Sequence, residues 1–247
     1  MERMKYSLPM KAFKYFILIL LILLPQTALS QNPSHKTITE QILKEGWVKK
    51  RETSEFTIFF RDVKGPGTGE ILMIGIIDAS PAKMFQIVTN YKHFMDYMPF
   101  VEYAKVLHEE KVSTKKHVSY VFFYISAPIV SSRFYTIRLT DEINFDGKEG
   151  VYRSKWDLDV GKYRKTPDDP DIKPYLQTGW QMPVETPINE GYWLLKPVDE
   201  GKKTYITYYL WTNPGGAINP ELANEANVIA LPKLWNTLKK QADLYSK

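Results

Sequence analysis

The C-terminal part of the chain, a turn followed by one long amphipathic segment, most constrains the fold. Residues 213–219 are rich in Pro, Gly and Asn. They lead into Asn219-Pro220-Glu221, which is typical of a helix start, because Asn caps, Pro fits the first turn and a carboxylate suits the helix dipole. Apolar residues then recur at steps of three and four, at Ala223, Ala226, Ala230, Leu234, Leu238, Ala242 and Tyr245, with Leu231 beside them. We expect Pro232 to kink or divide this helix.

Nearly all of the chain upstream has the pattern of strands. The segment 55–63 alternates between two faces, and 70–78 is an almost unbroken apolar run in which Gly75 allows a bend or a close backbone approach. Further strands are expected at 47–51, 101–109, 117–126, 134–145, 151–160, 191–197 and 203–211, and short helices at 37–46 and after Ser80-Pro81. This order predicts an α+β fold, in which a curved antiparallel sheet of about eight or nine strands wraps around the long C-terminal helix.

The first thirty residues have the pattern of a secretory signal peptide. Four basic residues precede an apolar run from residue 15 to 24, and Ala28-Leu29-Ser30 supplies small residues for cleavage after Ser30. The run is shorter than the roughly 20 residues of a membrane span, although an uncleaved anchor remains the alternative. We therefore expect a signal peptide at 1–30, a single domain at 31–247, and a periplasmic or secreted location.

Composition excludes several classes of protein. The chain has no Cys, so no disulfide can support an exported domain and the fold must rest on its core. The expected leader carries four basic residues and one acid, so its removal lowers the net charge from +5 to +2. No basic block remains of the kind that nucleic-acid binding requires. The expected partners therefore include no nucleic acid.

Catalytic motifs are missing from the sequence. There is no G-x-S-x-G, no P-loop and no H-E-x-x-H, and His35, His93, His108 and His117 are scattered without ligand spacing. We expect a protein that is not an enzyme and that uses neither cofactor nor metal. His93 follows a helix and could lie near the mouth of a cavity.

The longest connection, residues 161–187, contains five prolines and an acidic tip at Asp168, Asp169 and Asp171. Connections of this length in a compact domain are usually functional or disordered. The tip could bind a cation through carboxylate oxygens, although a solvated charged loop is the favoured interpretation. Trp180, in the Gly179–Pro183 part of this loop, either packs down or lies at an opening.

Three stretches together resemble the START (StAR-related lipid-transfer) domain of the helix-grip superfamily. The first runs from Gly75 to Val101 and is similar to that family's strand, short helices and aromatic passage. The second, 127–138, resembles its Pro-to-Arg loop and following strand, although Arg133 is followed by Phe134 where the family has Asp. The third joins Gly191-Tyr192-Trp193, Thr207-Tyr208-Tyr209 and the region from Gly215 to Pro232.

The resemblance implies a sheet that grips the terminal helix around a deep apolar tunnel holding one lipid. The ligand would be a sterol, a hopanoid, a phospholipid or a fatty-acid derivative, carried by a monomer that contacts membranes transiently. The sequence agrees, because its strands hold more aromatic and Met side chains than one helix can cover, and unfilled apolar volume binds apolar ligands. Two rivals stay open: a cyclase- or hydrolase-type enzyme of the same superfamily, and an interaction module without a cavity.

The candidate ligand-binding residues are taken from the strands, the aromatic cluster after the first short helices, the long loop and the C-terminal helix. They are Ile74, Ile76, Phe94, Met98, Phe122, Tyr124, Arg138, Trp156, Trp180, Tyr208, Leu210, Ile229, Leu231 and Leu234. A slip of one residue in strand parity would reverse every strand assignment. Arg138 is included because, in the resembling family, an arginine at this point can meet the polar end of the ligand; an outward, paired Arg138 is the alternative. We expect Arg133 to bond backbone carbonyls and Asp141 and Glu142 to be exposed.

Overall fold

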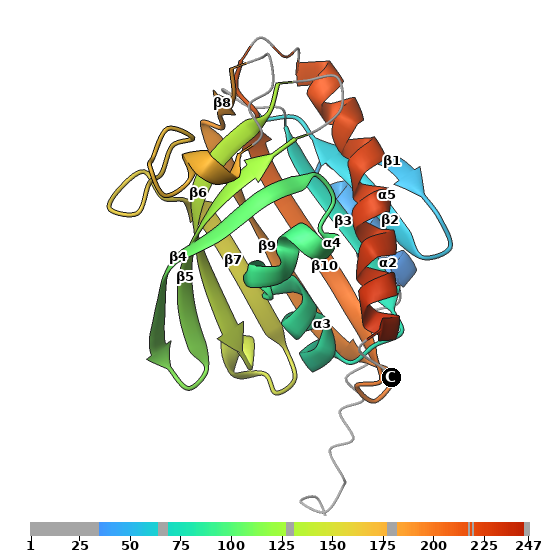
Figure 1. The fold of residues 1–247 in the computed structure, drawn as a ribbon. Helices are drawn as coiled ribbons and strands as arrows, with labels where there is room; N and C mark the ends of the chain where they lie inside the picture. Colours follow the sequence, from blue (N-terminus) through green and yellow to red (C-terminus); the bar gives the residue numbers. More distant parts are fainter. Residues whose placement is uncertain are drawn as a thin grey trace, which may run out of the picture.

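The computed structural model describes residues 35–63, 69–126, 131–176, 182–216, 218 and 220–244. A strongly curved antiparallel sheet forms most of the domain, and the long C-terminal helix crosses one face of it (Figure 1). The predicted α+β helix-grip architecture is therefore confirmed. The leader expected at residues 1–30, the expected cap Asn219 and Tyr245 lie outside the described residues.

The sheet brings the first strands of the domain beside the last one. Its strands are β1 (Val48–Glu52), β2 (Phe56–Arg61), β3 (Glu70–Ile77), β4 (Val101–Ser113), β5 (Lys116–Ile125), β6 (Arg133–Ile143), β7 (Tyr152–Leu158), β8 (Val184–Glu185), β9 (Ile188–Val198) and β10 (Lys203–Asn213). Nine of them follow the order β1-β2-β3-β10-β9-β7-β6-β5-β4, all antiparallel, and β8 pairs in parallel with the start of β6. The β10–β3 pairing joins β1, β2 and β3 to the rest of the sheet.

The helices are α2 (His35–Lys44), α3 (Pro81–Val88), α4 (Phe94–Tyr97) and α5 (Pro220–Leu244), with short 3-10 turns η1 (Tyr91–His93), η2 (Phe145–Gly147) and η3 (Lys173–Tyr175). The predicted start of α3 is confirmed, because the Ser80 hydroxyl accepts a hydrogen bond from the backbone N–H of Lys83 and Pro81 occupies the first turn. Within the described ranges, no helix combines the length and apolarity that a membrane span requires.

The buried face of α5 contains Leu231, Leu238 and Ala242, as predicted, and also Trp235, which the prediction missed. Trp235 is fully buried, and its ring lies 5.4 Å from that of Phe56. A side chain as large as Trp235 gains more from burial than an alanine does. The helix runs through Pro232 as a single element, so Pro232 does not divide it.

Gly75 allows α5 to lie this close to the sheet. A Cβ atom at this position would come within 2.5 Å of both the Glu55 carbonyl oxygen and the Trp235 ring. Any other residue at position 75 would therefore push the helix or the neighbouring strand away. The close backbone approach expected at Gly75 is confirmed.

The outer face of the sheet, opposite α5, is also covered. Helix α2 packs there over one apolar cluster, Ile42, Trp47, Phe59, Leu72, Ile74 and Tyr205. The loop after β7 covers a second cluster, Phe122, Tyr124, Phe134 and Ile172. Because both faces are buried at these places, the strands carry large apolar residues on both sides, and simple alternation is lost.

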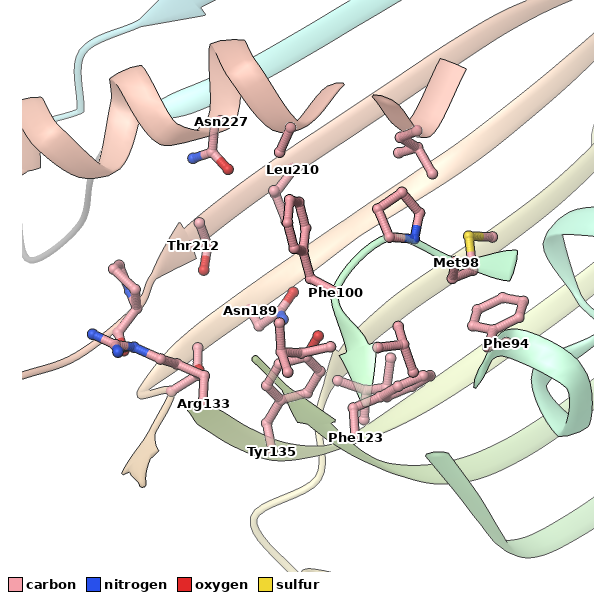
Figure 2. Close-up of a pocket in the computed structure, with 18 of the residues that line it drawn as sticks. Phe94, Met98, Phe100, Phe123, Arg133, Tyr135, Asn189, Leu210, Thr212 and Asn227 are labelled. Carbon is pink, nitrogen blue, oxygen red and sulfur yellow. The ribbon is translucent and has the colours of Figure 1, made fainter. Parts of the chain in front are cut away.

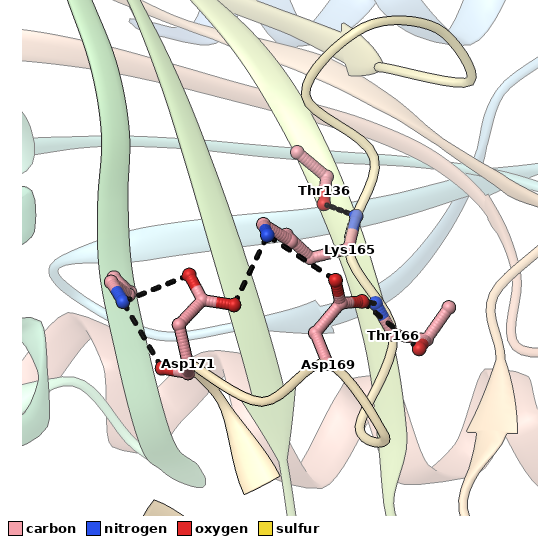
Figure 3. A network of polar contacts seen from close by, with 6 residues as sticks. Thr136, Lys165, Thr166, Asp169 and Asp171 are labelled. Carbon is pink, nitrogen blue, oxygen red and sulfur yellow. Dashed lines mark hydrogen bonds and ion pairs between the residues drawn. The ribbon is translucent and has the colours of Figure 1, made fainter.

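The loop after β7 is held down by ion pairs (Figure 3). The Lys165 ammonium lies 3.2 Å from an Asp169 carboxylate oxygen and 3.0 Å from one of Asp171, and the Lys165 backbone N–H donates to the Thr136 hydroxyl at 3.0 Å. Lys105 also pairs with Asp171, at 3.1 Å. The acidic tip is thus neutralised by lysines, and the described residues contain no group of acids and histidines that could hold a metal ion.

Replacing Trp235 with Ala should lower the free energy of unfolding by about 3–5 kcal/mol, because it empties a fully buried site. The matched control is Ile229→Ala on the same helix, where the side chain is 63% exposed and the change should be within about 0.5 kcal/mol. Urea unfolding followed by fluorescence and circular dichroism measures both. Equal losses from the two variants would contradict this anchoring role of Trp235.

Candidate ligand-binding cavity

A cavity of about 620 Å³ lies between the inner face of the sheet and the first half of α5. Strands β4, β5, β6, β7, β9 and β10 form its walls, and α3, η1, α4 and α5 complete it. Most of the lining side chains are apolar or aromatic. The space exists because α5 carries the small residues Ala226 and Ala230 here, whereas Trp235 and Leu238 fill the corresponding space in its second half.

Strand alternation determines which side chains reach the cavity. On β6 the lining residues are Arg133, Tyr135, Ile137 and Leu139, and on β10 they are Tyr208, Leu210 and Thr212. Each set is spaced by two residues, as one face of a strand requires. On β5 the lining residues are Phe123 and Ile125.

The structure brings eight of the fourteen candidate residues to the cavity wall. They are Phe94, Met98, Trp156, Tyr208, Leu210, Ile229, Leu231 and Leu234. They come from four separate stretches of the chain, which only the fold brings together. That they contact a ligand stays a prediction.

Four candidates on strands face the wrong way. Ile74 is buried in the outer cluster beneath α2, and Ile76, on the same side of β3, is 42% exposed. Phe122 and Tyr124 lie in the outer cluster beneath the loop, and their neighbour Phe123 lines the cavity. The inward-facing side of these strands was predicted wrongly because both faces carry large apolar side chains.

Arg138 is also placed outside the cavity. Its guanidinium forms two hydrogen bonds with the Asp157 carboxylate, at 3.2 and 2.9 Å, on the exposed outer face of neighbouring strands. This pair raises the pKa of Arg138. The outward alternative was therefore correct for Arg138, and Trp180 lies outside the described residues.

Several wall residues were missed by the sequence analysis. Figure 2 shows Phe100, Phe123, Tyr135, Asn189, Thr212 and Asn227 around the cavity. The alternation Arg133, Tyr135, Ile137, Leu139 was a usable signal for β6. Phe100 had no such signal, because it lies just before β4 with a positive φ of 66°, which bulky residues rarely adopt.

A polar network crosses the cavity wall. The Trp156 indole N–H donates to the Asn189 side-chain oxygen at 3.0 Å, and Asn189 also hydrogen-bonds Tyr135. Burial raises the pKa of Tyr135 to about 12 and that of Tyr208 still further, so both stay neutral phenols. Among the described residues nothing hydrogen-bonds the Tyr208 hydroxyl, which leaves it available to a ligand.

A second polar group lies where α3 and η1 meet the sheet. The Tyr91 hydroxyl donates to the Asp141 carboxylate at 2.7 Å and lies 3.1 Å from the Ser154 hydroxyl. Tyr91 and Ser154 line the cavity, and Asp141 is buried behind them. Desolvation raises the pKa of Asp141 to about 6, although hydrogen bonds from Ser154 and Tyr91 oppose the shift. The expectation that Asp141 is exposed was therefore wrong.

His93 does not join this group. Its imidazole Nδ1 lies 3.0 Å from an Asp96 carboxylate oxygen, and both side chains are exposed and outside the cavity wall. Glu142 pairs with Arg153 and is only partly exposed. The acid–histidine pair inside the cavity that would favour an enzyme is therefore not formed by His93.

Comparison with known proteins identifies the fold. No family model and no curated protein sequence matches the chain. Among solved structures, the STAR-related lipid transfer protein fragment 25–204 from Xanthomonas axonopodis is 23% identical, with a TM-score of 0.60 over 80% of this chain and 99% of that one.

Two human structures are also similar. STARD10 is 12% identical, with a TM-score of 0.62 over 87% of this chain and 81% of its own, and StAR-related lipid transfer protein 5 is 14% identical, with a TM-score of 0.62 over 86% and 96%. At these identities the likeness shows the fold. The chain has the START-type helix-grip fold, as the sequence resemblance predicted.

The raised pKa of Asp141 predicts a pH-dependent stability. Between about pH 4 and pH 6 the folded protein holds a proton on Asp141 that the unfolded chain has released, so the free energy of unfolding should fall as pH rises through this interval. The loss is on the order of 3 kcal/mol for a shift of about two pKa units. Urea unfolding at pH 4 to 7 should show wild type losing stability relative to Asp141→Asn. Parallel pH curves for the two proteins would contradict it.

Proposed function

We propose that the protein binds a single hydrophobic lipid in this cavity and carries it through an aqueous compartment. The observation that carries the proposal is the largely apolar cavity of about 620 Å³ beneath α5. A volume between about 300 and 1,000 Å³ suits one small organic ligand. Burying a few hundred Å² of apolar ligand surface gains roughly 25 cal/mol per Å², before the costs of association.

The fold supports the same function. Two of the similar solved structures are lipid transfer proteins by name, and they share the sheet and terminal helix that form the cavity here. The proposed ligand is a sterol, a hopanoid, a phospholipid or a fatty-acid derivative. The pattern of residues 1–30 supports export, and we propose that the protein acts in the periplasm as a monomer that contacts membranes transiently.

Ligand entry requires part of the wall to move, and the first half of α5 is the part best suited to do so. It covers the cavity through Ala226, Ala230 and the exposed Ile229, whereas Trp235 anchors the second half in the core. Motions of such lids fall in the microsecond to millisecond range.

Uptake of lipid from liposomes tests the proposal. Wild-type protein should extract one lipid molecule per chain, read by native mass spectrometry, and the mass of the exported chain reports cleavage after Ser30. Met98→Trp should reduce uptake severalfold, because Met98 lines the cavity and a larger side chain fills it. Met95→Trp is the matched control, since Met95 is exposed outside the wall. A wild type that takes up no lipid would overturn the proposal.

A second candidate function, a hydrolase-type enzyme, rests on the Ser154 hydroxyl, which faces the cavity and hydrogen-bonds a buried acid. An acid is a weak base for activating serine, and the described wall residues include no histidine. We therefore expect wild type and Ser154→Ala to release p-nitrophenol from p-nitrophenyl palmitate at the same background rate. Faster release by wild type alone would favour the enzyme.

A further inference from the structure

Arg133, the first residue of β6, is the most buried arginine that the structure describes, with 8% of its surface exposed. Its Nε–H donates to the Pro214 carbonyl at 3.1 Å, one terminal nitrogen donates to the Gly215 carbonyl at 3.3 Å, and the other donates to the Ser131 carbonyl. Three neutral acceptors therefore surround one full positive charge.

No described carboxylate neutralises this charge. Four other described arginines each pair with an acid: Arg61 with Glu70, Arg138 with Asp157, Arg153 with Glu142 and Arg164 with Glu185. Burial lowers the pKa of Arg133, and no acid offsets the effect. A buried charge is costly unless a counter-ion pairs with it, so an anionic ligand would stabilise this arginine.

The side chains around Arg133 divide the cavity into two ends. Figure 2 shows Arg133, Thr212 and Asn227 toward one end and Phe94 and Met98 toward the other. The first end offers neutral hydrogen-bonding groups beside the Arg133 cation. The second end is mostly apolar, and its hydroxyls, those of Tyr91 and Ser154, already bond to Asp141 behind them. A ligand that matches this division has a polar head and an apolar tail.

We propose that the cavity takes an amphiphile with an anionic head, a carboxylate or a phosphate ester, whose oxygens pair with Arg133 while its tail lies toward Phe94 and Met98. A guanidinium has five N–H donors, of which the three carbonyls use three, so two remain for the ligand. Guanidinium groups bind carboxylates and phosphates through bidentate hydrogen bonds. This inference rests on the proposed lipid-binding function and specifies its ligand class.

The competing interpretation is that Arg133 is only a latch that ties the β10–α5 connection to β6. A latch would affect all ligands equally, whereas an anion site would discriminate by head-group charge. Ligands with one tail and different heads therefore separate the two interpretations.

The test compares dodecanoate, dodecyl phosphate and dodecanol binding to the wild-type protein by isothermal titration calorimetry. At least one anion should bind about ten- to a hundredfold more tightly than dodecanol, as a charged hydrogen-bonded pair implies. Preference for dodecanoate points to fatty-acid-like ligands, and preference for dodecyl phosphate to phospholipid-like ones. Equal binding of all three overturns the anionic-head inference and leaves lipid binding intact; binding of none, with no lipid extracted from liposomes, overturns both.

Variants of Arg133 test whether this residue causes the preference for anionic ligands. Arg133→Gln should weaken binding of the preferred anion about ten- to a hundredfold more than it weakens dodecanol binding. Arg133→Lys, which keeps the charge but cannot reach three carbonyls, should retain part of the preference. Arg138→Gln, five residues along the same strand and outside the cavity, should behave as wild type. Equal loss for all three ligands in both Arg133 variants would show a latch. The comparison of the three ligands uses the wild-type protein alone, so it still tests the anionic-head inference if Arg133→Gln does not fold.

Discussion

The burial of Trp235 against the sheet is the contact on which the rest of the architecture depends. It holds the second half of α5 in the core beside Phe56, and Gly75 supplies the close approach that the indole ring needs. Since this half of the helix is fixed, the first half lies over the sheet, where its small residues Ala226 and Ala230 leave space unfilled. The cavity is thus a consequence of unequal packing along one helix: large side chains at one end and small ones at the other.

The covering of both faces of the sheet explains what could be predicted from the sequence and what could not. Most strands, their succession along the chain and the terminal helix follow from local patterns and were predicted, whereas β8 lies inside the connection expected at 161–187. Which face of a strand points inward follows from alternation only where one face is solvated. At Phe122, Phe123 and Tyr124 both faces of the strand are buried, one beside the cavity and the other beneath the loop that carries Ile172. Which of these residues faces the cavity could therefore be determined only from the fold.

The same reasoning applies to the polar residues of the site. Arg133 and Arg138 on β6 are five residues apart, so alternation places them on opposite faces, and only the set Arg133, Tyr135, Ile137 and Leu139 indicates which face is the inner one. Their partners lie far away in the chain: Asp157 on β7 pairs with Arg138 on the outer face, and the carbonyls of Pro214 and Gly215 accept hydrogen bonds from Arg133. Asp141 is a similar case, because its burial depends on Tyr91, fifty residues earlier.

The position of Arg133 links the proposed ligand head to the proposed opening of α5. Two of its three carbonyl partners, Pro214 and Gly215, lie in the connection that enters this helix, so lifting the first half of α5 would strain these two hydrogen bonds. Each bond to a charged donor contributes about 1.5–3 kcal/mol, which is a substantial share of the stability of a typical domain, about 5–15 kcal/mol. An anionic head would pair with the two N–H groups that the carbonyls leave open, so it can bind without breaking these bonds. The residue proposed to bind the head would therefore also hold the start of α5 over the cavity.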